Sequence, residues 1–171
     1  MAASFFLTTA AHAVGTEQGS DEPPKPTETT QDCAHGTIWD DKIEACVAPE
    51  DSTNDQASLY LNARELAWAG RLDDASRVLN VMQPSHKVLT YQGFVVRAEA
   101  NWSKAESLYQ AALTANPNNL LARSYYGQGL AENGDISGAQ NQLSEIRQRG
   151  GRISWPETAL RLTIETNSTA Y

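Results

Sequence analysis

The sequence predicts an all-α fold of three tandem helix-turn-helix repeats followed by a capping helix, and two observations support this prediction. Between residues 86 and 117, small and large apolar residues recur at helical spacing, with Gly93 on a first helix and Ala105 on a second. Gly127 and Ala139 repeat this pair 34 residues later. Self-similarity at such a period is the signature of stacked helical repeats.

The helical region is predicted to span residues 56–166. Its repeats cover residues 56–85, 86–119 and 120–153, and the first is shortened because the step from Ala75 to Ala105 is 30 residues instead of 34. The turns inside the three pairs fall at Gly70, Asn101 and Gly134, and Gly and Asn tolerate the left-handed conformation that ends a helix.

A capping helix over residues 154–166 is predicted after the third repeat. Ser154 can cap it, Pro156 suits the first turn, and Glu157 stands where a capping box needs an acid. This helix would cover the apolar face that the last repeat leaves open. Residues 167–171 are expected to form a frayed tail.

The repeat pattern resembles the tetratricopeptide repeat, which has a small residue at its eighth position, alanine at its twentieth and proline at its thirty-second. The resemblance is closest to small exported proteins of the proteobacterial cell envelope that carry this repeat, and it covers residues 56–166. It implies a right-handed α-solenoid. The structural repeat positions that it marks are Ala75, Gly93, Ala105, Pro117, Gly127 and Ala139.

The N-terminal part of the sequence has a different composition. Residues 1–13 end in Ala-His-Ala, which suits a signal peptidase, although the segment lacks a basic start and is short; it is either a signal peptide or a mildly apolar N-terminus. Residues 14–32 contain three prolines and almost no large apolar residue, so we expect a disordered acidic linker. Residues 48–55 are polar and are expected to be a hinge that also supplies a helix N-cap.

Cys33 and Cys46, the two cysteines of the chain, predict a small disulfide loop over residues 33–47. In the chain-entropy model such a loop contributes roughly 3 kcal/mol. Trp39 either packs against this disulfide or stacks on a sugar ring, as in a glycan-binding loop. A metal site at Cys33, His35 and Cys46 lacks a fourth ligand at any usual zinc spacing, so no metal is expected.

Charge is unevenly distributed along the chain. The net charge is −8, and residues 14–55 hold 11 acidic residues against Lys25 and Lys42. No basic cluster suggests a nucleic-acid partner, and no stretch is apolar enough to span a membrane. Together with the expected disulfide, these features predict an exported protein, periplasmic or secreted.

The sequence offers little for catalysis, because its three histidines accompany no nucleophile motif, phosphate loop or metal-ligand pair. We therefore expect a non-enzymatic protein-interaction module or adaptor without cofactors. The resemblance implies a peptide-binding groove lined by the first helix of each pair. Its residues would be Tyr60, Arg64, Lys87, Thr90, Phe94, Arg97, Ser124 and Gln128.

The positive charges of Arg64, Lys87 and Arg97 favour a partner peptide that is acidic or ends in a carboxylate. The acidic N-terminal segment, tethered nearby, is a candidate to dock in the same groove. An alternative is a cell-wall or glycan-binding protein that uses the Cys33–Cys46 loop, with the repeats as a spacer. A third is a structural subunit of an envelope complex.

Overall fold

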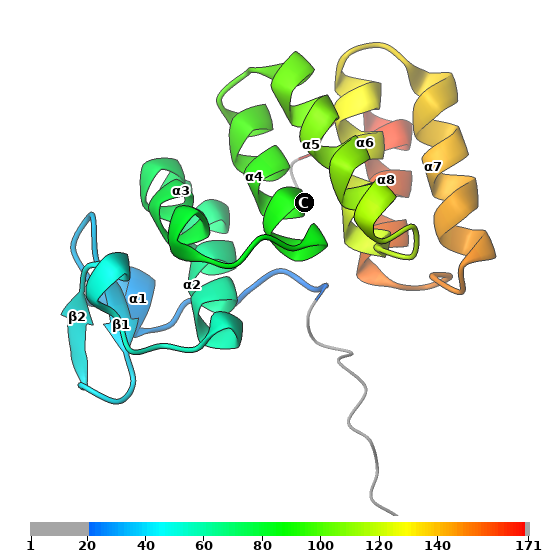
Figure 1. The fold of residues 1–171 in the computed structure, drawn as a ribbon. Coiled ribbons are helices and arrows are strands. Elements are labelled where there is room, and N and C mark those ends of the chain that lie inside the picture. The colour runs from blue at the N-terminus through cyan, green and yellow to red at the C-terminus, as the bar shows by residue number, and fades with distance from the viewer. Residues whose placement is uncertain (1–20, 170–171) are drawn as a thin grey trace, which may run out of the picture.

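The structure, a computed structural model, describes residues 21–169 and is mostly helical (Figure 1). That part of the chain contains eight α-helices and one two-stranded sheet. The predictions for residues 1–13 and 14–20, and for the last two residues of the tail, lie outside the described residues.

Six helices form three consecutive pairs, and a seventh follows them. The helix of each pair nearer the N-terminus also contacts its counterpart in the next pair, and α8 packs on α6 and α7. The predicted helical region is thus confirmed as helix. The bounds are α2 Gln56–Trp68 with α3 Leu72–Val81, α4 His86–Ala98 with α5 Trp102–Ala115, α6 Leu120–Glu132 with α7 Ile136–Gln148, and α8 Trp155–Thr166.

Short polar side chains begin six of these seven helices. Each accepts a hydrogen bond from the backbone N–H three residues later, which satisfies a donor that the helix itself leaves unpaired. At α8 only half of the expected capping box forms, because the Glu157 carboxylate accepts from Nε of Arg147 at 2.9 Å. The capping residues are Asp55, Ser85, Asn101, Asn119, Asp135 and Ser154.

Five helices end at a residue with positive φ, and α8 is one of them, at Asn167. After the other four, the next N–H bonds back to a carbonyl five residues earlier. Three of these residues are glycines, Gly70, Gly134 and Gly150. The fourth is Ala100, with φ of 61°. The left-handed residue of the α4–α5 turn is therefore Ala100 and not Asn101, which instead caps α5.

Small residues lie where the helices approach most closely. A Cβ atom on Gly93 would lie 2.6 Å from the Tyr109 ring of α5, and one on Gly127 would lie 2.6 Å from Leu160 of α8. Ala75, Ala105 and Ala139 are completely buried. Pro117 is exposed, and its carbonyl accepts from the Arg123 guanidinium at 2.9 and 3.1 Å.

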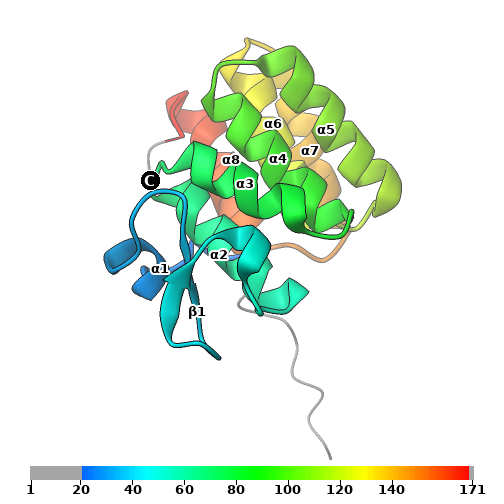
Figure 2. The same cartoon turned by 60° about the vertical axis from the view of Figure 1, so that its left-hand side comes forward.

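The N-terminal region is more ordered than its composition predicts. Residues 28–31 form α1 (Glu28–Gln31), and the disulfide loop contains a hairpin of β1 (Ile38–Asp40) and β2 (Ala45–Val47), with Ile38 opposite Val47. The disulfide itself is confirmed. The expected hinge includes the 3₁₀ helix η1 (Pro49–Asp51). Figure 2 shows this unit against α2; we call residues 27–54 the N-terminal cap.

The prediction of disorder was therefore wrong for residues 27–32. Thr27 caps α1 by accepting from the N–H of Thr29. The carboxylate of Glu65 on α2 accepts from the N–H of Thr27 at 2.7 Å and from that of Thr30 at 3.1 Å. A segment with few apolar residues is held here by polar contacts to a distant helix, which its local composition does not reveal.

Candidate functional site

All eight predicted groove residues lie on α2, α4 and α6, on one face that we call the inner face. The structure brings them together, but most of them are covered. Arg64 is only 2% exposed, and Thr90, Ser124 and Gln128 are equally buried. Tyr60 is buried, whereas Lys87, Phe94 and Arg97 are partly exposed.

A chain of polar contacts crosses the inner face from α2 to α6. Nε of Arg64 donates to the Tyr91 hydroxyl at 3.1 Å, and the hydroxyls of Tyr91 and Tyr125 are 3.4 Å apart. Nε1 of Trp68 donates to the same Tyr125 hydroxyl at 3.2 Å. Burial acts to lower the pKa of Arg64, yet attraction to Tyr91 and the hydrogen bond outweigh it and raise the pKa, so the side chain stays charged.

Aromatic rings fill the space around this chain. Phe94 stacks on Trp68 with centroids 6.2 Å apart and packs on Tyr125 at 5.0 Å. Trp155, at the start of α8, reaches Trp68 at 6.2 Å. The inner face is consequently a packed aromatic layer along much of its length, with charged groups at its edges.

Arg97 links α4 to α6 beside this layer. Its guanidinium donates to the Tyr125 carbonyl at 3.0 Å and to the Gln128 side chain at 3.2 Å, and lies 3.8 Å from the Glu132 carboxylate. Gln128 in turn donates to Ser124 at 3.1 Å. A hollow of about 270 Å³ opens here, lined by Trp68, Phe94, Arg97, Ala98, Glu132 and Thr169.

Thr90 and Lys87 occupy the other end of the face. The Thr90 hydroxyl donates to the His86 carbonyl at 2.7 Å and accepts from the Asn119 amide at 2.9 Å, so it ties α4 to the start of α6. Nζ of Lys87 lies 5.6 Å from the centre of the Tyr60 ring, within range of a cation–π contact. Burial, with a smaller contribution from Lys87, lowers the pKa of His86, which is therefore neutral near pH 7.

Residues 21–26, Asp-Glu-Pro-Pro-Lys-Pro, lie against the inner face; we call this segment the strap. Nη2 of Arg64 donates to the carbonyl of Glu22. Asp21 and Glu22 line a cavity of about 790 Å³ together with Trp155 and Pro156 at the start of α8. In Figure 1 the dark-blue segment runs from α1 beneath α2. The three prolines of the strap lack an N–H and hold it extended.

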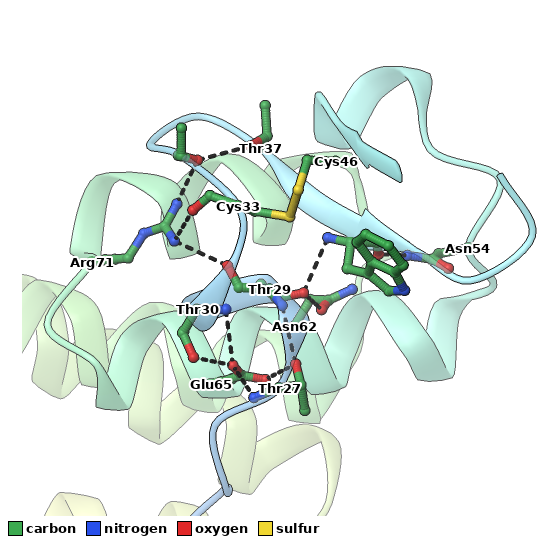
Figure 3. Close-up of a disulfide and its surroundings, with 12 residues drawn as sticks. Thr27, Thr29, Thr30, Cys33, Thr37, Cys46, Asn54, Asn62, Glu65 and Arg71 are labelled. Carbon is green, nitrogen blue, oxygen red and sulfur yellow. Dashed lines mark hydrogen bonds between the residues drawn. A yellow bond between two sulfur atoms is a disulfide. The ribbon is translucent and has the colours of Figure 1, made fainter. Parts of the chain in front are cut away.

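The strap is anchored where it enters the N-terminal cap (Figure 3). The hydroxyls of Thr27 and Thr30 both donate to the Glu65 carboxylate, in addition to their N–H groups. The Thr29 hydroxyl donates to the Asn62 side chain. Four donors therefore satisfy one largely buried carboxylate and fix the end of the strap on α2.

A second set of polar contacts joins the cap to the α2–α3 turn. Arg71 donates to the carbonyls of Thr29, Cys33 and Ala34 at 2.8–3.1 Å (Figure 3). Its Nε also donates to Asp74 at 2.7 Å, and Asp74 accepts from the N–H of Gly36 at 2.8 Å. Although burial alone would raise the pKa of Asp74, these hydrogen bonds lower it.

Asp40 organises the interior of the cap. Its carboxylate is fully buried and accepts from the N–H groups of Lys42, Ile43 and Thr53 and from the hydroxyls of Ser52 and Thr53. Burial would raise the pKa of Asp40, but these five donors hold it well below its usual range. The aspartate is therefore structural.

No group of three or more His, Cys, Asp and Glu side chains between residues 21 and 169 is arranged to hold a metal ion. None of the helices in that range is long and apolar enough to cross a bilayer. Trp39 is half-buried, and it borders a small hollow against α2. Nothing here tests the glycan-binding hypothesis for this loop.

Sequence reasoning missed the residues that fill the inner face. Tyr91, Tyr125 and Trp68 contact one another there, and Trp155 joins them from α8. The one available signal was an accumulation of large aromatic residues in these helices. Tyr91 and Tyr125 are separated by the 34-residue period, which places both at the same position of successive pairs.

Comparisons with known proteins add no relatives. No protein-family model, curated protein or solved structure matches this chain at a significant level.

Proposed function

We propose that this protein is a non-enzymatic interaction module that binds an extended peptide segment on the inner face of α2, α4 and α6. In this proposal the three helical pairs are tetratricopeptide-like repeats, and the inner face is the concave side of a short solenoid. The chain is an exported adaptor, for which the disulfide of the cap is the supporting feature.

The strap is the single observation that supports this function best. It is an extended, proline-rich, acidic segment that already lies against the inner face, and the buried Arg64 guanidinium recognises its backbone carbonyl at Glu22. A carbonyl contact of this kind does not depend on the side chain of the bound residue. The same groups can therefore receive a segment of another protein once the strap leaves.

The hollow beside Arg97 suits the continuation of such a segment. It is bordered by the stacked rings of Trp68 and Phe94, by the Arg97 guanidinium and by the Glu132 carboxylate, which lies 3.8 Å from that guanidinium. Aromatic and arginine side chains dominate the binding energy of many interfaces because they bury large areas and still offer polar contacts. An acidic partner segment with an apolar anchor is the chemistry that fits, and the strap acts as its intramolecular competitor.

A peptide copied from the strap tests the proposal directly. A chain lacking residues 1–26 should bind a fluorescent Asp-Glu-Pro-Pro-Lys-Pro-Thr peptide in a saturable way, measured by fluorescence anisotropy. The full-length chain should bind it at least about tenfold more weakly, because a tethered segment competes at a high effective concentration. Unchanged circular dichroism and thermal melting would establish that the shortened chain is folded.

Two arginine variants of the shortened chain serve as a matched pair. Arg64→Met should abolish binding of the peptide, since the group that donates a hydrogen bond to its carbonyl is gone. Arg161→Met, at an exposed arginine of α8 that pairs with Glu165, should bind like the unmodified shortened chain. Equal loss in both variants, or no saturable binding to the shortened chain, would rule out the inner face as a peptide site.

A further inference from the structure

Leu61 is an exposed leucine of α2, and the surface around it has a definite chemistry. Its side chain is 57% exposed although large apolar neighbours lie nearby. It borders two separate hollows, one toward the α3–α4 connection and one toward the N-terminal cap. No residue of the strap lines either of them. Tyr60 and Lys87, at one end of the inner face, line the first, so this surface adjoins the inner face away from the strap.

The larger hollow has a volume of about 370 Å³ and is mostly apolar. Among the residues that the structure describes, Lys87 is the one charged residue of its lining and no carboxylate lines it. The contact of this ammonium group with the Tyr60 ring holds the charge at the wall. A large apolar side chain followed by an acidic group matches these features. The full lining is Gln56, Ala57, Tyr60, Leu61, Met82, Gln83, Pro84, Ser85 and Lys87.

The backbone fixes the shape of this hollow. The N–H of Gln83 donates to the Gln56 side chain at 2.7 Å, which ties the α3–α4 connection to the first turn of α2. Ser85 caps α4 and so sets the direction in which the first turn, with Lys87, leaves the connection. Hydrogen bonds therefore hold both the α3–α4 connection and the start of α4, so the apolar walls of the hollow are formed before any segment binds.

The smaller hollow has the opposite charge. It measures about 140 Å³ and lies between the Trp39 side chain and α2. Between residues 21 and 169, three carboxylates line it, Glu28, Asp41 and Glu65, and no lysine or arginine does. Because Glu65 is occupied by the threonines of α1, Glu28 and Asp41 are the exposed acids of this end.

We propose that the surface around Leu61 docks a short segment of a partner protein with a fixed charge order. The segment places a large apolar side chain and an adjacent acidic residue at the Met82–Lys87 hollow, and a basic residue at the Trp39–Asp41 hollow, with Leu61 packed between them. Exposed apolar patches with a polar rim mark protein interfaces, and opposite charges at the two ends determine the orientation of the bound segment.

Selection from a displayed library of random short peptides tests this proposal on the full-length chain. Wild type should enrich peptides that carry an acidic residue next to a large apolar one, with a basic residue toward the other end. Leu61→Asp, a change at an exposed position, should not retain them. Selection on Lys87→Glu should enrich peptides with a basic residue in place of the acidic one, and wild-type peptides should bind this variant about tenfold more weakly.

The controls separate this surface from the strap site at Arg64. Lys104→Glu alters an exposed lysine of α5 and should select the same peptides as wild type. Arg64→Met, which disables the proposed peptide site of the inner face, should leave them bound. Three outcomes would each overturn the proposal: no common peptide sequence is enriched, Lys87→Glu enriches the same sequence as wild type, or Arg64→Met loses binding of the selected peptides. The first two outcomes leave the inner-face function unaffected.

Discussion

The indole N–H of Trp68 donates to the hydroxyl of Tyr125 at 3.2 Å, although the two residues are 57 positions apart in the chain. Trp68 ends the first helix of the first pair, and Tyr125 lies in the first helix of the third. The contact therefore joins the two outer pairs directly across the inner face, over the pair that separates them in sequence.

Replacing Trp68 by phenylalanine should destabilise the protein without unfolding it. The variant keeps an aromatic ring against Phe94 but loses the hydrogen bond to Tyr125 and part of the packing with Trp155. We expect a loss of about 1–3 kcal/mol in the free energy of unfolding, measured by urea denaturation. Tyr126→Phe, which removes a more exposed hydroxyl bonded to Glu106, should cost less.

Replacing Ala100 by glycine should stabilise the protein. Ala100 ends α4 with φ of 61°, a conformation that disfavours a Cβ atom, whereas the equivalent turns use Gly70 and Gly134. Relief of this strain should raise the free energy of unfolding by about 1 kcal/mol. Ala98→Gly, within the last turn of the same helix, should lower the free energy of unfolding. If both glycine variants were more stable than wild type, the positive φ of Ala100 would not be the cause.

Protonation of Asp40 should account for part of the loss of stability in acid. Its pKa in the folded protein lies below the ordinary value of 3.8, so the unfolded chain binds this proton first as pH falls. The contribution of Asp40 to the free energy of unfolding is complete above the unfolded-state pKa of 3.8 and is lost as pH drops through the folded-state pKa. Asp40→Asn should be less stable near neutral pH and should show a shallower loss below about pH 4 in urea titrations. An unchanged slope would indicate that other carboxylates, such as Asp74, dominate.

Local signals were sufficient to place most helices. Asp55, Ser85 and Ser154 stand before apolar runs and cap the helices that follow, and Gly70 and Gly134 end α2 and α6. These features work within one or two turns of chain, which is why a single sequence reveals them. The pairing of Cys33 with Cys46 was equally accessible because the chain has no other cysteine.

Contacts between distant segments account for what the sequence did not reveal. Helix α1 depends on hydrogen bonds to Glu65, and the sequence of residues 27–32 does not indicate that this distant side chain is their partner. Arg64 lies on the inner face with the other predicted groove residues, but its burial follows from Tyr91 and the strap. Helical periodicity specifies the side of a helix to which a residue belongs, and it carries no information on what covers that side.

The attachment of the N-terminal cap changes where the folded unit begins. Helical periodicity alone would favour a boundary at Gln56, yet a fragment that starts there would expose the Glu65 carboxylate and the Arg71–Asp74 pair without the backbone groups that they bind. The cap in turn contains the disulfide. Recombinant production therefore requires an oxidising compartment and a start at or before Thr27, so that Glu65, Arg71 and Asp74 keep their partners in the cap.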